Sequence, residues 1–189
     1  MFQYCPCCAA SGIDFVNNRY FYCKACGFTY YHNTAAAVGC IISTGSHIMF
    51  LVRAKEPSLG KLDVPGGFID PGEGALEGLL RECQEEIGWP PAAQPGKASG
   101  NKKSSPRFTF FASFPNVYPY KGIIYNTCDL FFSITAPDLT EADLTLDRGE
   151  NREVRFIRPE NIDLSELAFD STRRAVEAYL AKNKISRNK

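Results

Sequence analysis

Residues 66 to 89 of the chain are GGFIDPGEGALEGLLRECQEEIGW. It begins as a glycine-rich loop and continues into a segment that carries Glu82, Glu85 and Glu86. Residues three and four apart are neighbours on a helix, so the pairs that Glu82 forms should each cost about 0.2–0.5 kcal/mol through like-charge repulsion. The sequence therefore predicts that a cationic group lies between these carboxylates.

Apolar residues in this segment recur at intervals of three and four, which is the spacing of one helix face. They predict a helix over residues 74–87 that packs on a sheet through Leu76, Leu79, Leu80, Cys83 and Ile87. The charged residues, the three glutamates included, are expected off this stripe. In the loop before the helix, Gly66, Gly67 and Gly72 permit tight turns and a close approach of the backbone to a ligand.

A cluster of carboxylates on the polar side of a helix suits Mg²⁺ or Mn²⁺ shared with the phosphates of a substrate. The alternative is a solvated acidic helix face, which is the usual meaning of such a run. Arg81 has Glu77 one turn before it and Glu73 at the end of the loop. Either glutamate can pair with Arg81 and tie the loop to the helix.

The loop and the helix together resemble the Nudix box. The fixed positions of that signature are filled at the right spacing by Gly67, Glu73, Arg81, Glu82, Glu85, Glu86 and Gly88. Cys83 and Trp89 occupy positions that are usually aliphatic. The resemblance implies an α+β fold, the Nudix fold, in which a mixed β-sheet is sandwiched between α-helices.

The same resemblance implies a metal-dependent hydrolase of nucleoside diphosphates linked to another group. The implied ligands of Mg²⁺ or Mn²⁺ are the carbonyl oxygen of Gly67 and the carboxylates of Glu82, Glu85, Glu86 and Glu153. The implied catalytic residues are Glu85, Glu86, Glu82, Arg81 and Glu73, the last in a supporting role. The base that accepts the proton of the attacking water is sought among Glu85, Glu86, Glu150 and Glu153. For Glu153 the alternative is a surface charge at the end of a strand.

Four of the eight cysteines have the spacing of a structural zinc site. Cys5 and Cys8 form one Cys-x2-Cys knuckle, and Cys23 and Cys26 form the second after fourteen intervening residues. Redox-active thiols are the alternative, and Cys7 is a surplus thiol that could replace a neighbour. We expect a zinc ribbon over residues 1–33, with a hairpin that turns at Asn17 and Asn18, and a Nudix domain over residues 34–189.

Composition argues against two classes of partner. Lys and Arg number 21 and so do Asp and Glu, so the chain has no overall positive field to bind nucleic acid in bulk. Its apolar runs are shorter than the roughly 20 residues that span a membrane, and the N-terminus does not resemble a secretory signal. We expect a cytoplasmic protein that binds a small-molecule nucleotide.

The rest of the chain predicts the parts of a mixed sheet. Two apolar runs at residues 35–43 and 48–53 predict a hairpin, and a helix is expected over residues 171–183. Residues 90–106 are rich in Pro, Gly, Ser and Lys and are interpreted as a mobile loop. Further strands are predicted in the segments RFTFFASF, IIYNTCDLFFSI and EVRFIR.

A four-cysteine ribbon before a Nudix domain is similar to the NADH pyrophosphatase branch, whose members are homodimers. This likeness favours a dinucleotide substrate such as NADH, NAD or ADP-ribose. The Ser-Gln-Pro-Trp stretch of that branch is absent, however, and Tyr118 and Tyr120 stand near its expected place. These tyrosines either stack on a base or pack against the sheet. The alternative function is a non-catalytic sensor of a nucleotide metabolite, but a sensor has no need of the complete set of box residues.

Overall fold

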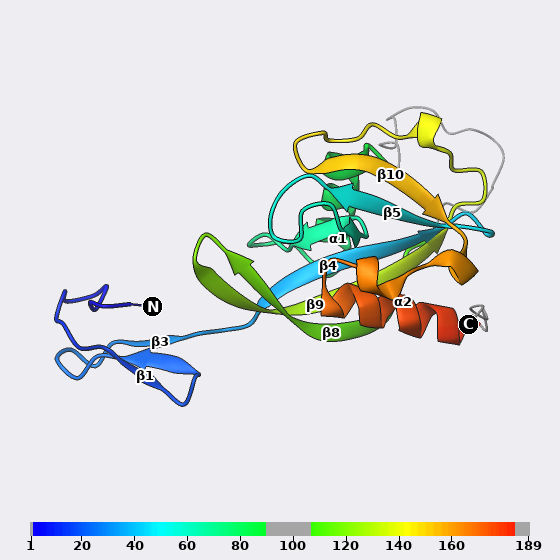
Figure 1. Ribbon diagram of the computed structural model, residues 1–189. Helices are drawn as coiled ribbons and strands as arrows, with labels where there is room; N and C mark the ends of the chain where they lie inside the picture. The colour runs from blue at the N-terminus through cyan, green and yellow to red at the C-terminus, as the bar shows by residue number, and fades with distance from the viewer. Residues whose placement is uncertain (1, 90–106, 184–189) are drawn as a thin grey trace, which may run out of the picture.

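The computed structural model describes residues 2–89 and 107–183, and the loop expected at residues 90–106 lies outside this part. A three-stranded sheet near the N-terminus is followed by a seven-stranded sheet (Figure 1). The small sheet contains β1 (Asp14–Val16), β2 (Tyr20–Tyr22) and β3 (Thr29–Tyr31). The large sheet contains β4 (Ala35–Ser43), β5 (Ile48–Arg53), β6 (Leu62–Asp63), β7 (Gly66–Phe68), β8 (Thr109–Tyr120), β9 (Ile123–Thr135) and β10 (Asn151–Ile157).

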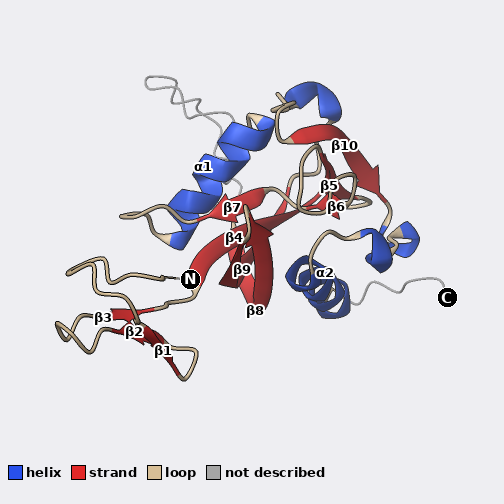
Figure 2. Cartoon of the chain, turned by 60° about the vertical axis from the view of Figure 1, so that its left-hand side comes forward, coloured by secondary structure: helices blue, strands red, loops and turns tan. Residues whose placement is uncertain are grey.

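Two α-helices cover the large sheet from opposite sides (Figure 2). They are α1 (Ala75–Ile87) and α2 (Asp170–Lys182). Short 3-10 helices are η1 (Glu141–Asp143), η2 (Pro159–Asn161) and η3 (Leu164–Glu166). Among the described residues, no helix combines the length and the apolar character needed to cross a membrane.

The large sheet is mixed. Its main strands follow the order β10-β5-β4-β9-β8, while β6 pairs with β5 and β7 pairs with β4. Only the β4 and β9 pair is parallel, and the other pairs are antiparallel. The predicted hairpin of β4 and β5 is confirmed, although its ladder extends over only two residue pairs before β7 takes the place of β5 beside β4.

Successive residues of a strand point to opposite faces of the sheet, so the buried strand β4 contributes side chains to two hydrophobic cores, one on each face. Val38, Cys40 and Ile42 pack in the cluster that contains Leu79 of α1. Ile41 packs in the other cluster, which contains Val176, Tyr179 and Leu180 of α2. The predicted fold class, a mixed sheet between helices, is therefore confirmed.

Three of the five residues of the predicted apolar stripe of α1 are buried. Leu79, Cys83 and Ile87 are fully buried, but Leu76 is 45% exposed and Leu80 is 37% exposed. Glu86 takes a position on the buried face instead, with 9% exposure. The helix starts after Gly74 and ends at Gly88, whose left-handed φ of 62° suits a glycine.

The strands β8 and β9 form a longer hairpin than the sequence predicted, because they continue through Tyr118 and Tyr120 to a turn at Lys121 and Gly122. Pro115 and Pro119 lie within β8. Proline cannot donate to a sheet ladder and is tolerated on an edge strand, and β8 is the edge of this sheet.

Candidate active site

Arg81 is the cationic group between the glutamates of α1. Its Nη1 atom donates to Glu82 Oε1 at 2.9 Å and to Glu85 Oε2 at 3.2 Å. Its Nε and Nη2 atoms donate to the two carboxylate oxygens of Glu73 at 2.8 and 2.9 Å in a bidentate ion pair. Nη2 also donates to the carbonyl oxygen of Phe68. One guanidinium therefore holds the loop, β7 and two box carboxylates together.

Of the two partners proposed for Arg81, the structure places Glu73 against it. Glu77 instead accepts a hydrogen bond from the backbone of Gly74 at 2.7 Å, at the start of the helix. The hydrogen bonds from Arg81 are the main cause that lowers the pKa of Glu73 below its usual range. Glu73 therefore lies where a loop-supporting residue should lie.

Arg81→Lys is expected to lower kcat/KM by about 10- to 100-fold, because a lysine ammonium cannot bridge the carboxylates and the Phe68 carbonyl in this planar arrangement. Steady-state kinetics of the nucleotide hydrolysis that the box resemblance implies checks this. Arg173→Lys is the matched control, since Arg173 pairs with Asp170 and Glu177 along the exposed side of α2. A kcat/KM of wild-type size in Arg81→Lys would contradict the expectation.

Glu86 is buried beneath the loop rather than displayed on a polar face. Its Oε2 atom accepts from the backbone N–H of Gly66 at 2.8 Å, and its Oε1 atom accepts from Asn151 Nδ2 at 3.1 Å. Burial raises the pKa of Glu86 to about 8, against the lowering effect of these two hydrogen bonds. In the described residues Glu86 has no ion-pair partner, so its ionised form lacks a compensating charge.

Gly67 and Glu82 lie in close contact. A Cβ atom added at Gly67 would stand 2.4 Å from Glu82 Oε1, so a side chain there would have to displace the Glu82 carboxylate. Burial is also the main cause that raises the pKa of Glu82, and Arg81 opposes it. The carboxylate and the loop backbone thus approach each other where the box resemblance places metal ligands.

A cleft of about 470 Å³ brings most of the predicted site residues together. Its lining includes Gly67, Glu82, Glu85, Glu86 and Glu150. Glu150 forms an ion pair with Lys55 at 2.5 Å. Glu153 is not part of this lining, and its exposed carboxylate pairs with Arg155 at 2.5 Å.

This set of side chains fits a divalent cation in its chemistry. All the donors are hard oxygen atoms, and the buried Glu86 carboxylate lacks a cationic partner among the described residues. Arg81 donates hydrogen bonds to Glu82 and Glu85. Within the described residues, the three box carboxylates do not form a group whose oxygen atoms all lie within 4.8 Å of one another, whereas the sulfur atoms of the four cysteines do. A bound cation would therefore compete with Arg81 for these two carboxylates.

Tyr118 and Tyr120 line the same cleft as the box carboxylates. The ring of Tyr118 meets Phe68 edge-on at 5.6 Å and lies 5.5 Å from Phe169. Tyr120 is 45% exposed and its ring lies 6.4 Å from that of Tyr118. Tyr118 therefore packs against neighbouring rings and also contributes to the cleft wall.

The cleft also contains polar residues that the sequence analysis did not single out. Arg53 and Asp63 form a largely buried ion pair at 3.2 Å, and Thr172 donates to Asp63 at 3.0 Å. Thr127 and Asp129 are buried polar residues of β9. A single carboxylate inside the apolar run CDLFFSI was the available signal for Asp129.

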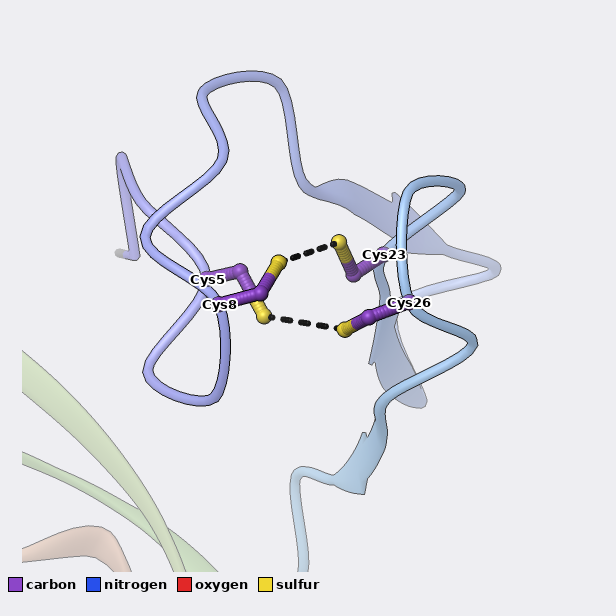
Figure 3. Close-up of side chains that lie close together, drawn as sticks. All are labelled: Cys5, Cys8, Cys23 and Cys26. Carbon is purple, nitrogen blue, oxygen red and sulfur yellow. Dashed lines mark hydrogen bonds between the residues drawn. The ribbon is translucent and has the colours of Figure 1, made fainter.

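The four predicted zinc ligands form a compact group (Figure 3). The sulfur atoms of Cys5 and Cys26 lie 3.7 Å apart, as do those of Cys8 and Cys23. Tetrahedral zinc with Zn–S bonds of about 2.3 Å requires sulfur atoms about 3.8 Å apart. The group therefore fits a zinc ion, and Cys7 is not a member of it.

The comparison with protein families agrees with this geometry. The family model of the NUDIX domain matches residues 33–179, which is most of the chain. The chain belongs to the Nudix family. The box, the mixed sheet and the two covering helices are thus parts of a Nudix domain.

Two curated relatives match part of the Nudix chain. The NAD-capped RNA hydrolase NudC of Pseudomonas fluorescens is 29% identical over 85 residues, which are 45% of this chain and 30% of that protein. The ADP-ribose pyrophosphatase of Methanocaldococcus jannaschii is 38% identical over 61 residues, which are 32% of this chain and 36% of that protein. The chain thus spans about a third of the length of these relatives.

Solved structures share the Nudix fold. A NUDIX hydrolase from Nitrosomonas europaea superposes with a TM-score of 0.63 at 21% identity, and covers 98% of this chain and 94% of its own. The NUDIX domain of NrtR from Shewanella oneidensis, solved with ADP ribose, has a TM-score of 0.59 at 15% identity. It covers 82% of this chain and 91% of its own. At such identities the likeness shows the fold alone.

Proposed function

We propose that this protein is a metal-dependent pyrophosphohydrolase that cleaves a nucleoside diphosphate linked to another group. The substrate class is a dinucleotide or a nucleotide sugar, such as NADH, NAD or ADP-ribose. The observation that carries the proposal is the buried Glu86, which faces the same cleft as Glu82 and Glu85 without a cationic partner among the described residues. The two partial relatives are named for hydrolysis of NAD-capped RNA and of the pyrophosphate of ADP-ribose, which supports the same chemistry.

The proposed ligands of Mg²⁺ or Mn²⁺ are the Gly67 carbonyl and the carboxylates of Glu82, Glu85 and Glu86. The cation would supply charge neutralisation at the diphosphate and a more acidic water molecule. Arg81 and Glu73 hold the loop in place through their paired hydrogen bonds. Glu150 lines the cleft, whereas Glu153 pairs with Arg155 and is not part of the lining, so Glu150 is the better placed of the two late glutamates.

Among the candidate bases, Glu85 suits proton transfer best. Its side chain is 59% exposed, it lines the cleft, and its hydrogen bond to Arg81 is the longest of that cluster at 3.2 Å. It can therefore turn towards a water molecule without leaving a buried group unpaired. Glu86, by contrast, is fixed by Gly66 and Asn151.

Chromatography of the reaction products tests the proposal. The protein and Mg²⁺ are mixed separately with NADH, NAD, ADP-ribose, diadenosine polyphosphates and nucleoside triphosphates. We expect AMP with reduced nicotinamide mononucleotide from NADH, AMP with nicotinamide mononucleotide from NAD, or AMP with ribose 5-phosphate from ADP-ribose. If none of these compounds is cleaved, even with Mn²⁺, the sensor alternative replaces the enzyme proposal.

The homodimer, the cytoplasmic location and the domain boundary at residue 33 stay predictions.

A further inference from the structure

Two buried polar atoms in the cleft lack a hydrogen-bond partner. They are Thr127 Oγ1 and Asp129 Oδ1, and within residues 2–89 and 107–183 no other buried side-chain nitrogen or oxygen shares this condition. Thr127 is 3% exposed, Asp129 is 8% exposed, and both line the cleft that contains Glu82 and Glu86. Buried polar groups are nearly always paired. Two unpaired ones on one cleft wall therefore point to a partner outside the chain.

The position of these residues relates them to the box. Thr127 and Asp129 are two residues apart on β9, so their side chains lie on the same face of the sheet. Asp129 pairs with Ala37 of β4, and Ala37 pairs on its other side with Phe68, the residue after Gly67. Neighbouring strands lie about 4.8 Å apart, so Asp129 lies about 10 Å across the sheet from Phe68. A ribose separates a phosphate from its base by a distance of this order.

The carboxylate of Asp129 is held in a fixed orientation. Its Oδ2 atom accepts from Ser171 Oγ at 2.5 Å, and Ser171 is fully buried in the first turn of α2. The next residue, Thr172, is anchored in turn by its bond to Asp63. Because Oδ2 is occupied, Oδ1 is the oxygen left for a ligand.

Aromatic rings complete this part of the cleft. Phe68, Tyr118 and Phe169 all line it, and Tyr118 contacts both of the others. Flat aromatic surfaces beside hydrogen-bonding groups are the usual means by which proteins hold an unpaired base. The wall thus offers stacking surfaces as well as two unpaired polar atoms.

We propose that Thr127 and Asp129 form the base-recognition subsite of the nucleotide whose diphosphate is cleaved at the box, and that they select an amino-bearing base such as adenine. This inference rests on the proposed function. The free Oδ1 atom of the Asp129 carboxyl group offers an acceptor, whereas a threonine hydroxyl also donates. Adenine presents an amino donor beside a ring-nitrogen acceptor and so matches both residues. A purine with an oxygen in place of the amine would turn an acceptor towards Asp129.

Calorimetric titration with AMP and IMP tests the subsite without turnover, because these two nucleotides differ at the base alone. In the presence of Mg²⁺ we expect wild-type protein to bind AMP at least about tenfold more tightly than IMP. Asp129→Asn keeps the shape of the side chain but replaces one carboxylate oxygen with an NH₂ donor. This variant should bring the ratio of the Kd values for IMP and AMP close to one. Thr127→Val should lower the same ratio. Glu177→Gln, an exposed carboxylate of α2 outside the cleft, is the control that should keep it.

Equal affinities in wild-type protein, no binding of AMP, or an unchanged ratio in folded Asp129→Asn or Thr127→Val would overturn the subsite. Ordered water would then account for the two unpaired atoms. If Asp129→Asn does not fold, Thr127→Val decides the question. The product assay is independent of this result: a preference for AMP without cleavage of any substrate would retain the subsite and refute the enzyme proposal. Cleavage without a preference for AMP would refute the subsite alone.

Discussion

Replacing Glu86 with glutamine is expected to lower kcat by at least about 100-fold and to stabilise the metal-free protein at alkaline pH. The loss of activity follows from removing a buried carboxylate that is proposed to bind the catalytic cation. The side chain can still be accommodated, because the amide oxygen of glutamine can accept from the Gly66 N–H. A flipped Asn151 amide would then present its oxygen to the new NH₂ group. Loss of activity together with a gain in stability is expected for a residue that is needed for function but whose buried charge destabilises the fold.

The sign of the stability effect follows from the pKa of Glu86. Burial raises this pKa from 4.5 in the unfolded chain to about 8 in the folded protein. A carboxyl group whose pKa is higher in the folded state makes its full contribution to the stability below the unfolded-state pKa of 4.5. This contribution is lost as the pH rises through the folded-state pKa of about 8. Each unit of pKa difference corresponds to about 1.4 kcal/mol, so the free energy of unfolding should fall by on the order of 3 kcal/mol between about pH 5.5 and 8. Glu86→Gln should remove this fall.

Urea denaturation of the metal-free protein at the two pH values measures the effect, and kinetics with Mg²⁺ measures the loss of activity. Glu85→Gln is the matched control on the same helix. Since Glu85 is largely exposed, its replacement should also cost about 100-fold or more in kcat but change the free energy of unfolding by less than about 0.5 kcal/mol. Wild-type rates in either variant would refute the metal role of that residue. An unchanged pH dependence in Glu86→Gln would refute the raised pKa.

Much of the fold could be predicted because its signals are local. The helix α1 has apolar residues at helical spacing and a glycine at each end, and the strands β4 and β5 are apolar runs around a turn. The four cysteines could be grouped from their spacing alone. Short-range patterns of this kind follow from backbone geometry, so they can be recognised without knowledge of the tertiary contacts.

What could not be predicted depends on contacts between distant segments. Glu86 lies seven residues after Leu79 and three after Cys83, which is the spacing of the buried face, but its charge suggested exposure. Its burial depends on Gly66 and Asn151, 20 and 65 residues away. Likewise, the extension of β8 beyond the predicted segment RFTFFASF runs through Pro115 and Pro119, and its place at the edge of the sheet tolerates these prolines. Glu153 pairs with Arg155 and is not among the residues that line the cleft, so its role as a metal ligand stays a prediction.

Removing zinc is expected to unfold the N-terminal segment and leave the Nudix sheet folded. Among the described residues before β4, the buried apolar side chains are Cys5, Phe21 and Cys23, so two of the three belong to the cysteine group. Ring contacts of Phe21 with Phe2 and Phe15 add little further core. A unit with so few buried residues needs its metal to fold, and structural zinc supplies about 10–16 kcal/mol in isolated zinc-finger peptides.

Elemental analysis should find one zinc per chain in wild-type protein and in Cys7→Ser, and none in Cys23→Ser. The pair is matched because Cys7 is exposed and outside the group, whereas Cys23 is a buried member of it. Heteronuclear NMR of Cys23→Ser should show lost dispersion for residues 5–31, while the amides of β4, β5 and β9 keep their positions. Such a result would place the boundary between two folding units near residue 33. Collapse of both sheets together would instead mean that the cysteine group stabilises the Nudix core itself, since the large sheet would then depend on contacts that only the metal-bound segment provides.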